Sequence, residues 1–394
     1  MNYDLLFLVL FYLFLLLIFK IYRNKFEVQW KIFALYKTKI GINLMDKIAK
    51  RFPKLLNIIG YLSVTLGFIG MIITLIFIIY ETFKFLFVPK AEVALVPLIP
   101  GVAISDKLPM LSFWHWILAI LVVAVIHEFS HGVYARLRNI KIKSSGFAFL
   151  GPILAAFVEP DEKELKKRGT KDKLFVFSAG PFSNILLALV VILFLSFVFV
   201  PIGNSVTEIN GIMISEINDT LPIKESGLES GHVLQEVDGI KITNLSVLTD
   251  ILEKKSPGDI VLVKANNSFY NVELSQNPKD NTKAILGISF SSYKVDLKER
   301  FKPFSWMYKV FAWFGMLLFW IFNISLGVGL FNLLPLGPVD GGRMFHAVAL
   351  KITKNEKKAI KALSIISLII LAMILINLTP FIVRLLKFVV SPLF

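Results

Sequence analysis

Residues 116–131 read WILAILVVAVIHEFSH, so an unbroken apolar run leads straight into two histidines and a glutamate. A membrane-spanning helix needs about 20 mostly apolar residues, and this run lies within the longer apolar segment 111–135. On a helix, residues four positions apart share a face, so His127 and His131 can bind one metal ion. Glu128 can then reach a water on that ion and act as a general base. The alternative is a polar network between the helices of a transporter, although ionisable residues within membrane segments are usually functional.

The rest of the chain repeats the apolar pattern. Of the 394 residues, 56% are hydrophobic, and the mean hydropathy is +0.70. Apolar runs near the length of a membrane span occur at 5–19, 57–80, 111–135, 174–201, 307–334 and 362–379. The sequence therefore predicts a multi-pass α-helical membrane protein with about six spanning helices.

The net charge of +15 is distributed in a way that indicates lipid as the partner. Basic residues lie in the loops that flank the apolar runs, which is typical of loops facing anionic lipid. We therefore expect a lipid bilayer, and no nucleic acid, to interact with these charges. The chain has no cysteine, which excludes disulfides and thiolate metal sites, so any metal ion is held by His, Asp or Glu.

The loop charges also predict a topology. Cytoplasmic loops of membrane proteins carry an excess of Lys and Arg. Basic residues concentrate in loops 20–56, 136–173 and 343–361, whereas loop 81–110 is balanced and region 201–306 is slightly acidic. We therefore expect a cell-membrane protein whose N-terminus and middle region are extracytoplasmic and whose candidate metal site lies toward the cytoplasmic side.

Residues 143–158 are apolar but too short, and too interrupted by glycine and proline, to span a membrane. Non-helical backbone persists at membrane depth only where protein or a water-filled cavity covers it. The segment therefore predicts a re-entrant β-hairpin that lines a cavity. The alternative is a surface loop with an apolar tip.

Region 204–293 differs in composition from its surroundings and predicts a small β-rich domain inserted between membrane segments. Turn sequences such as Asn210-Gly211 and the SPGD at 256–259 separate its β-rich runs. These runs lie at 211–217, 233–237, 260–264 and 270–274, and an amphipathic helix is predicted at 246–255.

A third metal ligand is expected because catalytic zinc sites usually have three protein ligands and one open position. Only Asp4, Glu128 and Asp340 of the 28 acidic residues lie outside the loops, and Asp4 is at the terminus. Asp340 lies in NLLPLGPVDGGR at 332–343, where the prolines break a helix and the glycines allow close backbone approach. Asp340 is therefore the candidate, and the alternative is a cap for a helix that begins at Gly341.

Together these motifs resemble the site-2 protease family of intramembrane metalloproteases. The resemblance is carried by HEFSH at 127–131, SAGPFSN at 178–184, the segment 146–160, and Asn332, Pro335, Pro338, Asp340 and Gly341. It implies that His127, His131 and Asp340 bind Zn²⁺, that Glu128 is the catalytic base, and that 146–160 is a membrane-embedded β-hairpin near the site. Asn332 would then donate from its amide to an oxyanion, or else form a hydrogen bond between helices.

Region 204–293 resembles a PDZ domain of the protease-associated type. The resembling stretches are SGLESGHVLQEVDG at 226–239, PGD at 257–259 and LGI at 286–288. The resemblance implies that peptide segments bind along a strand edge, which we expect at 212–217 beside the helix 246–255. The alternative is a domain that only shields the entrance to the site.

The expected organisation has four parts: an N-terminal spanning helix and basic cytoplasmic segment at 1–56, a membrane core with the histidine helix and hairpin at 57–201, the PDZ-like domain at 204–293, and a C-terminal membrane region with Asp340 at 303–394. The resemblance implies a zinc metalloendopeptidase that cleaves membrane-spanning protein substrates in regulated intramembrane proteolysis. The alternative is a non-proteolytic membrane zinc-binding scaffold or a metal-ion transporter. A transporter would place ionisable residues on several segments, whereas this chain concentrates them at one point.

Overall fold

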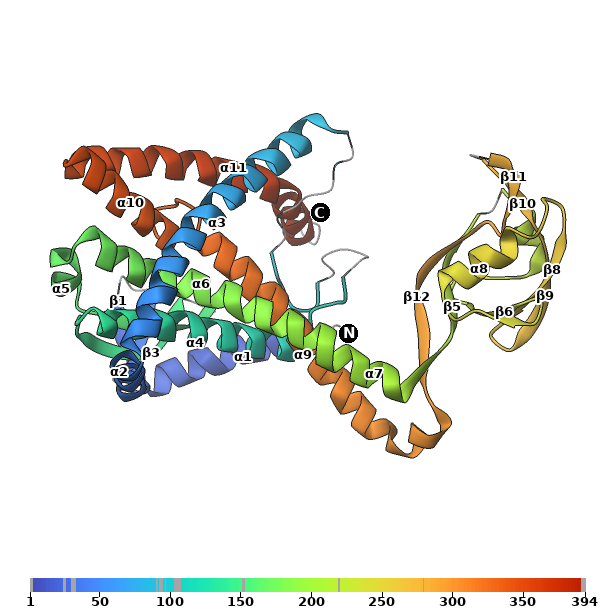
Figure 1. Cartoon of the computed structure of the whole chain (residues 1–394), viewed down its shortest axis with the longest axis horizontal. Coiled ribbons are helices and arrows are strands. Elements are labelled where there is room, and N and C mark those ends of the chain that lie inside the picture. The colour runs from blue at the N-terminus through green and yellow to red at the C-terminus, as the bar shows by residue number, and fades with distance from the viewer. Residues whose placement is uncertain are drawn as a thin grey trace. The chain divides into compact units, whose positions relative to one another are not determined.

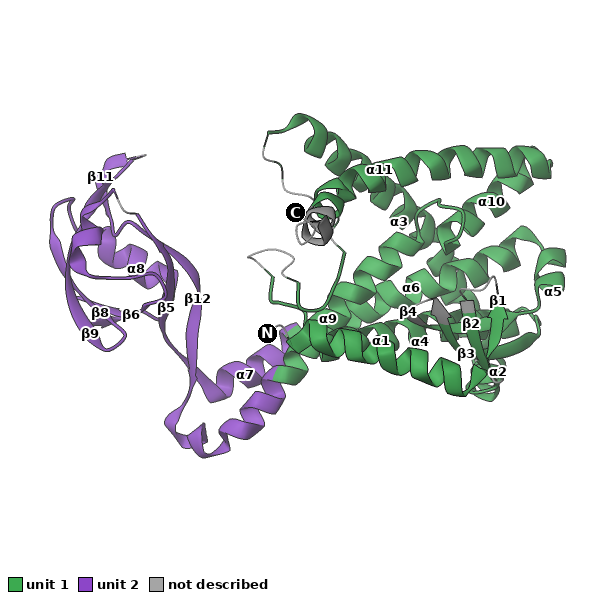
Figure 2. Cartoon of the chain, turned by 180° about the vertical axis from the view of Figure 1, so that it is seen from behind, with its two compact units in different colours: residues 1–195, 313–394 green, residues 196–312 purple. Residues whose placement is uncertain are grey.

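The computed structural model describes residues 3–23, 26–29, 33–89, 91, 95, 97–102, 108–150, 153–218, 220–278 and 280–390. The chain forms two compact units, which Figure 2 colours separately. Unit 1 comprises Met1–Leu195 and Trp313–Phe394, and unit 2 comprises Ser196–Ala312. A continuous β-rich segment is therefore inserted between two helical membrane regions, as the predicted fold class requires.

Six helices in the described residues are long and apolar enough to cross a membrane, which confirms the predicted multi-pass fold (Figure 1). They are α1 (Tyr3–Ile21), α3 (Pro53–Phe87), α4 (Phe113–Leu137), α6 (Thr170–Phe194), α9 (Ser305–Asn332) and α11 (Glu356–Val390). α6 continues through a π-helical turn, Leu195–Phe199, into α7 (Val200–Val206). Each of the predicted apolar runs lies along one of these helices.

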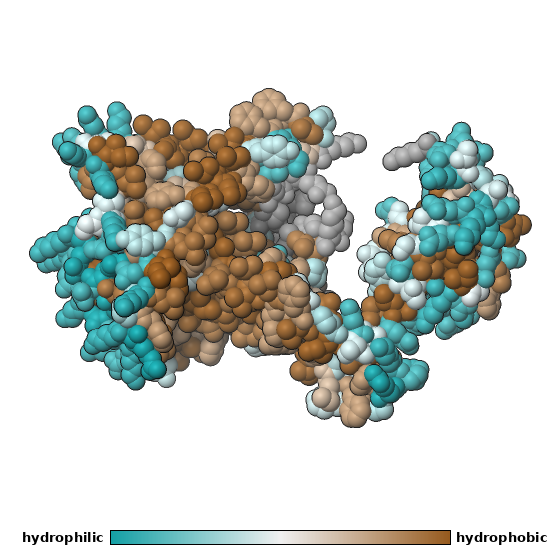
Figure 3. Space-filling model, in the orientation of Figure 1, coloured by the Kyte–Doolittle hydropathy of each residue, from teal (hydrophilic) through white to brown (hydrophobic). Residues whose placement is uncertain are grey.

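The helices of unit 1 expose large apolar side chains. On α3, for example, Ile72, Ile73 and Ile76 are 58%, 59% and 60% exposed. Figure 3 shows a broad hydrophobic surface over these helices, with hydrophilic residues gathered at the end that holds α2 (Ile42–Arg51) and α5 (Glu162–Lys167). Apolar surface on this scale is unfavourable in water and is the kind of surface that faces lipid.

Unit 1 also contains a four-stranded antiparallel sheet with the order β1-β2-β3-β4. Its strands are β1 (Glu27–Gln29), β2 (Phe33–Thr38), β3 (Ile142–Leu150) and β4 (Ile153–Pro160). β3 and β4 form the predicted hairpin, with Phe147 opposite Ala156, and the tip at 151–152 lies outside the described residues. β1, β2 and α2 were not predicted from the sequence. β2 pairs with its neighbour β1 on one side and with the distant strand β3 on the other, and the second pairing forms only in the folded protein.

Two local features fix the ends of the helices around the candidate site. Ser112 caps α4 by accepting a hydrogen bond from the His115 N–H. After α9, a turn that contains two prolines leads into α10 (Asp340–Thr353). A Cβ atom on Gly341 would collide with the backbone carbonyl of Leu333, which confirms the predicted close approach of the backbone at this turn.

Unit 2 is a β-rich domain with its own buried apolar core, which includes Ile212, Leu234 and Val263. Its elements are β5 (Thr207–Ile217), β6 (Val233–Val237), β7 (Ile240–Lys241), α8 (Leu245–Leu252), β8 (Ile260–Ala265), β9 (Ser268–Glu273), β10 (Ser275–Asn277), β11 (Asp280–Ile285) and β12 (Ile288–Leu297). The main sheet has the order β12-β5-β6-β8-β9, β7 pairs with β6, and β10 and β11 form a separate pair. The four predicted β-rich runs correspond to β5, β6, β8 and β9, and the predicted helix corresponds to α8.

The expectation that 212–217 forms a free peptide-binding edge is wrong. β12 pairs along β5, from Ile288 opposite Ile217 to Leu297 opposite Thr207, and β6 pairs with the other side of β5. β5 is therefore an inner strand, and in the described part of the chain the main sheet ends at β12 and β9. The residues that pair with 212–217 are 288–293, and these were not among the predicted β-rich runs, so the pairing was not foreseen.

Candidate metal centre

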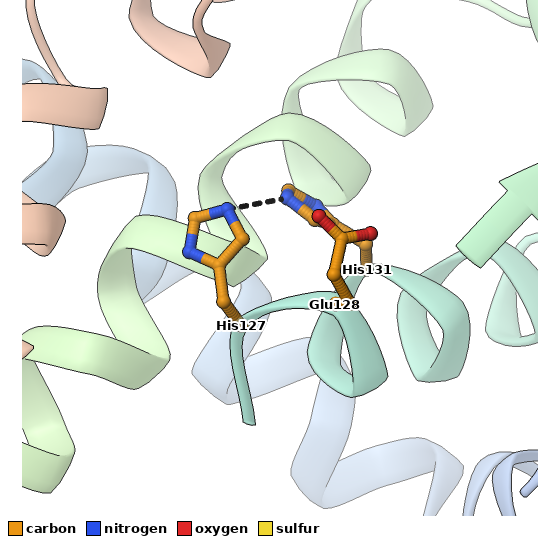
Figure 4. A group of neighbouring side chains, drawn as sticks. All are labelled: His127, Glu128 and His131. Carbon is orange, nitrogen blue, oxygen red and sulfur yellow. Dashed lines mark hydrogen bonds between the residues drawn. The ribbon is translucent and has the colours of Figure 1, made fainter. Parts of the chain in front are cut away.

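α4 brings two imidazoles together on one face. His127 and His131 are only 8% and 9% exposed, and their Nε2 atoms lie 3.1 Å apart. Figure 4 shows both rings extending from α4 into the same space, with Glu128 beside them. The one-turn spacing thus has the consequence that the sequence predicted, because positions four apart project from the same side of a helix.

Asp340 approaches this pair from the first turn of α10. Its Oδ2 atom lies 3.1 Å from the Nε2 atom of His127 and 3.1 Å from that of His131. The aspartate is 6% exposed, and its carboxylate is directed toward the imidazoles rather than toward the end of its own helix. Two segments more than 200 positions apart thus place three donor atoms in one small triangle.

The triangle has dimensions that suit a metal ion. Metal–donor distances of about 2.0–2.2 Å in a tetrahedral zinc site place pairs of donors about 3.3–3.6 Å apart. The observed separations of 3.1 Å are close to this range. Two imidazole nitrogens and a carboxylate oxygen also form a donor set that is common in catalytic zinc sites. The residues present therefore fit the predicted metal.

The outer ring nitrogens of both histidines have partners on α6. The Nδ1–H of His131 donates to the backbone carbonyl of Val176 over 2.7 Å, which leaves Nε2 with a lone pair for a metal. Nδ1 of His127 lies 3.0 Å from the side-chain amide of Asn184. Contacts of this kind orient metal-binding histidines and fix their tautomers.

Asn184 is fully buried, and its Oδ1 atom is without a hydrogen-bond partner among the described residues. A half-turn of the amide exchanges Oδ1 and Nδ2, and it places the oxygen where it can accept from the Nδ1–H of His127. That arrangement leaves the Nε2 lone pair of His127 facing the triangle. Ser325 holds this part of α6 by donating to the Asn184 backbone carbonyl over 2.8 Å.

Gly180 on α6 provides the space into which the two imidazoles fit. A Cβ atom at this position would lie 2.6 Å from the Nε2 atom of His127 and would also collide with His131. Gly180 and Asn184 both belong to the SAGPFSN stretch. This stretch carries part of the family resemblance, but neither residue was predicted to belong to the site, since nothing in their local spacing indicates contact with α4.

Glu128 lies beside the triangle and has a different partner. Its Oε2 atom accepts a hydrogen bond from the backbone N–H of Val158 on β4 over 2.9 Å. A carboxylate oxygen of Glu128 and ring nitrogens of His127 and His131 all lie within 4.8 Å of one another. The carboxylate is therefore near the candidate ligands without taking part in their triangle.

A pocket of about 300 Å³ opens onto these groups. Its lining includes the three predicted ligands, Glu128, Phe157 and Val158 of the hairpin, Asn332, and Arg343. The Asn332 Nδ2 atom donates to the Val328 carbonyl of its own helix over 2.9 Å, and among the described residues no hydrogen bond from this side chain to another helix is seen. One N–H of the same amide group remains to face the pocket.

The other three histidines lie away from this pocket. His115 lies between the Ser112 hydroxyl and the Trp313 carbonyl, and His232 is an exposed residue of unit 2. His346 lies on α10, where its Nε2 atom is 3.2 Å from a carboxylate oxygen of Glu356. Each has partners of its own outside the triangle.

Comparison with known proteins gives consistent matches to metalloproteases. The profile of peptidase family M50 matches residues 115–376, about two thirds of the chain. The chain is 24% identical over 325 residues to a putative zinc metalloprotease of Fusobacterium nucleatum, which covers 67% of this chain and 92% of that protein. It is 25% identical over 206 residues to the chloroplast membrane metalloprotease ARASP of Arabidopsis thaliana, over 43% of this chain and 45% of that protein.

Two further proteins are similar to this chain. An uncharacterized protein of Methanocaldococcus jannaschii is 29% identical over 332 residues, which cover 82% of this chain and 80% of that protein. A solved PDZ domain of an SdrC-like protein from Listeria monocytogenes is 20% identical with a TM-score of 0.19, over 21% of this chain and 87% of that domain.

Proposed function

Because this chain belongs to peptidase family M50, we propose that it is a zinc endopeptidase that cleaves membrane-spanning proteins within or at the edge of the bilayer. The observation that carries the proposal is the buried triangle formed by the Nε2 atoms of His127 and His131 and the Oδ2 atom of Asp340, with sides of 3.1 Å. These three residues are the proposed zinc ligands. The buried triangle in a membrane metalloprotease supports zinc as the ion, since this donor set is one that zinc prefers.

Bound zinc would supply a Lewis acid that polarises a peptide carbonyl and makes a water more acidic. Glu128 is the proposed general base: its carboxylate takes the proton of the attacking water and passes it to the leaving amine. It is suited to this role because it lies within 4.8 Å of the candidate ligand atoms but is engaged by Val158 rather than by the triangle.

Asn332 is proposed to stabilise the developing oxyanion. Its amide lines the same pocket as Glu128, and only one of its two N–H groups is needed for the bond to Val328. A pre-placed amide donor near a developing negative charge lowers the barrier to acyl transfer. This role requires the substrate carbonyl to lie between Asn332 and the metal ligands.

The substrate is proposed to be an extended segment of a membrane-spanning protein. A regular helix hides its carbonyls in hydrogen bonds, so the cleaved region must unwind before attack. β4 is at the end of its sheet, and Phe157 and Val158 on this strand line the pocket. An unwound substrate is therefore proposed to add to β4 as a further strand. We place this reaction in regulated intramembrane proteolysis, as the family resemblance implies.

Unit 2 is proposed to bind peptide segments of substrates or regulators. Because β5 is covered on both sides, binding by strand addition would use β12 or β9, the two ends of the main sheet in the described residues. The alternative role, which shields the entrance to the site, needs no peptide affinity. Binding of extended peptides to the purified protein, with and without unit 2, distinguishes these roles.

We propose that the N-terminus and the PDZ-like domain at 204–293 are extracytoplasmic and that the metal site lies toward the cytoplasm. The chain has no native cysteine, so a thiol reagent can label only a cysteine that is introduced. Ser246 on α8 is exposed, and the Lys166 side chain on α5 is 80% exposed. On intact cells, Ser246→Cys should react with a membrane-impermeant thiol reagent and Lys166→Cys should not; the reverse pattern would overturn the orientation.

The proteolytic function is tested with purified protein in detergent and a single-span test substrate. Removal of metal with a chelator should abolish cleavage, and added Zn²⁺ should restore it. Unchanged cleavage after metal analysis has confirmed that the metal is gone would contradict a zinc protease. Bound zinc without cleavage of any single-span substrate would favour a non-proteolytic zinc-binding scaffold or a metal-ion transporter.

A further inference from the structure

The β4 strand contacts the proposed general base through its backbone rather than through a side chain. The N–H of Val158 donates to Oε2 of Glu128 over 2.9 Å. A hydrogen bond from a neutral donor to a carboxylate is stronger than one between two neutral groups. Because any residue other than proline supplies the same N–H, no motif in the sequence marks this contact.

The direction of this N–H follows from the pairing of the hairpin. In an antiparallel ladder, successive residues direct their N–H groups to opposite sides of the strand. Val158 is opposite Ser145 on β3, but its N–H goes to Glu128 and therefore points away from β3. By the same alternation, the N–H of Phe157 points toward its partner Gly146, and the N–H of Ala156 points outward.

β4 is held firmly on its other side. β3 lies between β4 and β2 in the sheet, and Lys37 of β2 forms an ion pair with Glu159 of β4 at 3.0 Å. Ser144 of β3 donates to the same Glu159 carboxylate over 2.5 Å. The outward N–H groups of β4 are therefore fixed in position by the ladder and by these two contacts to the residue next to Val158.

On the premise that Glu128 is the general base, we propose that the backbone N–H of Val158 is its positioning group. By anchoring Oε2, the N–H removes rotamer freedom from a flexible side chain and leaves Oε1 free to accept a proton in the pocket. Placement of the hairpin is thereby coupled to placement of the base. In this role the N–H of Val158 acts through Glu128, and the Val158 side chain is not required.

If the hydrogen bond between Val158 and Glu128 inhibited the base, its removal would change kcat in the opposite direction. If the bond were a latch that keeps Glu128 inactive until substrate displaces it, its removal would raise turnover. The geometry favours positioning, because Oε2 is engaged while the carboxylate already lies within 4.8 Å of the candidate ligand atoms. The sheet on the far side of β4 also gives the strand no evident freedom to withdraw.

Proline substitution tests the N–H directly. At an outward position of an edge strand, proline removes a donor without breaking a ladder hydrogen bond. Val158→Pro should lower kcat by about 10–100-fold, since small displacements of a catalytic group have effects of this size, while KM and bound zinc are unchanged. Val158→Ala retains the N–H and should retain kcat. Ala156→Pro removes the neighbouring outward N–H, which does not reach Glu128 but faces the edge to which a substrate strand would add, so it should raise KM and leave kcat.

Three kinetic outcomes would overturn the proposal. They are an unchanged kcat in Val158→Pro, an increased kcat in Val158→Pro, and an equal loss in Val158→Pro and Ala156→Pro, which would indicate general damage to the strand. Failure of the proposed function is distinguishable from these, because it would appear as full activity in Glu128→Gln whatever the hairpin variants do.

A second measurement needs neither catalysis nor a proline. In the full-length protein, amide hydrogen exchange at Val158 should be slower than at Ala156, because only the former N–H has an acceptor on Glu128. Glu128→Ala should accelerate exchange at Val158 selectively, and Glu128→Gln, which keeps a carbonyl acceptor, should not. Equal exchange at Val158 in the wild-type protein and in Glu128→Ala would overturn the proposal even if Val158→Pro failed to fold.

Discussion

The candidate metal centre of unit 1 and the core of unit 2 are both buried, but they are assembled in different ways. The centre joins side chains from α4, α6 and α10, and its ligands His127 and Asp340 are 213 positions apart. The core of unit 2 lies within one continuous segment, with apolar residues such as Leu234 and Val263 on neighbouring strands. Substitutions near the centre should therefore change zinc binding, whereas substitutions in the core of unit 2 should change the stability of unit 2 alone.

The largest effect is expected from a change that preserves the metal. Glu128→Gln should lower proteolysis by about 10²–10⁴-fold, the usual contribution of a general base, while bound zinc stays unchanged. The amide oxygen of glutamine can still accept from Val158, so the loss would reflect the missing base rather than a displaced side chain. Cleavage of a test substrate and metal analysis of the same sample give the two readings, and full residual activity would refute the assignment.

Removal of the partner of His127 should weaken the metal site without eliminating a ligand. Asn184→Ala should lower zinc affinity by about 10–100-fold, as expected for residues that orient metal-binding histidines. Asn184→Asp retains an acceptor for the Nδ1–H of His127 and should lose less. The matched control is Asn323→Ala, because within the described residues Asn323 donates to the Phe319 carbonyl of its own helix and not to a histidine. Competition with a chromophoric chelator measures the affinities, and wild-type affinity in Asn184→Ala would contradict this role.

The same substitution of one buried leucine in each unit compares the two units. Leu234 in unit 2 and Leu333 beside the α9–α10 turn are both 0% exposed, and either change to alanine should cost about 2–5 kcal/mol of local stability. Leu333 packs near Met344 of the helix that carries Asp340, so Leu333→Ala should also reduce bound zinc. Leu234→Ala should increase hydrogen exchange within unit 2 alone. Equal zinc loss in both variants would show that the units are not independent in this respect.

Removal of the β-rich part of unit 2, residues 207–297, should have the smallest effect on the metal. The strands β5 and β12 begin and end opposite each other, and the Lys298 N–H donates to the Val206 carbonyl over 3.1 Å. Residues 207–297 can therefore be replaced by a short glycine-serine linker between Val206 and Lys298. The shortened protein should bind zinc as before and cleave some test substrates with altered preference. Loss of zinc would show that unit 2 supports the centre.

The difference between local and long-range assembly also explains which site residues could be predicted from the sequence. The positions of His127, Glu128 and His131 followed from helical periodicity, and Asp340 stood out because acidic residues are rare in the apolar segments. Asn184 and Val158 did not stand out, because their contacts with the histidine helix arise only when distant elements pack. A backbone donor such as the Val158 N–H cannot be recognised from the sequence, because every residue except proline has one.

For the fold, the sequence predicted elements better than their pairing. Each apolar run corresponds to a helix because its length and composition are local properties. β2 pairs with β3, a strand more than 100 residues away, and β12 was not among the predicted strands, so its pairing with β5 was not foreseen. These are tertiary effects, and the error about the free edge of β5 had the same origin.

Metal content shows whether His127, His131 and Asp340 hold one metal ion. Zinc per chain should be measured by mass spectrometry in purified wild-type protein, Asp340→Ala, Asn332→Ala and Glu128→Gln. We expect about one zinc per chain in the wild type, in Asn332→Ala and in Glu128→Gln, and a clear loss in Asp340→Ala, because only the last change removes a ligand. About one zinc per chain in Asp340→Ala would refute the proposed ligand set.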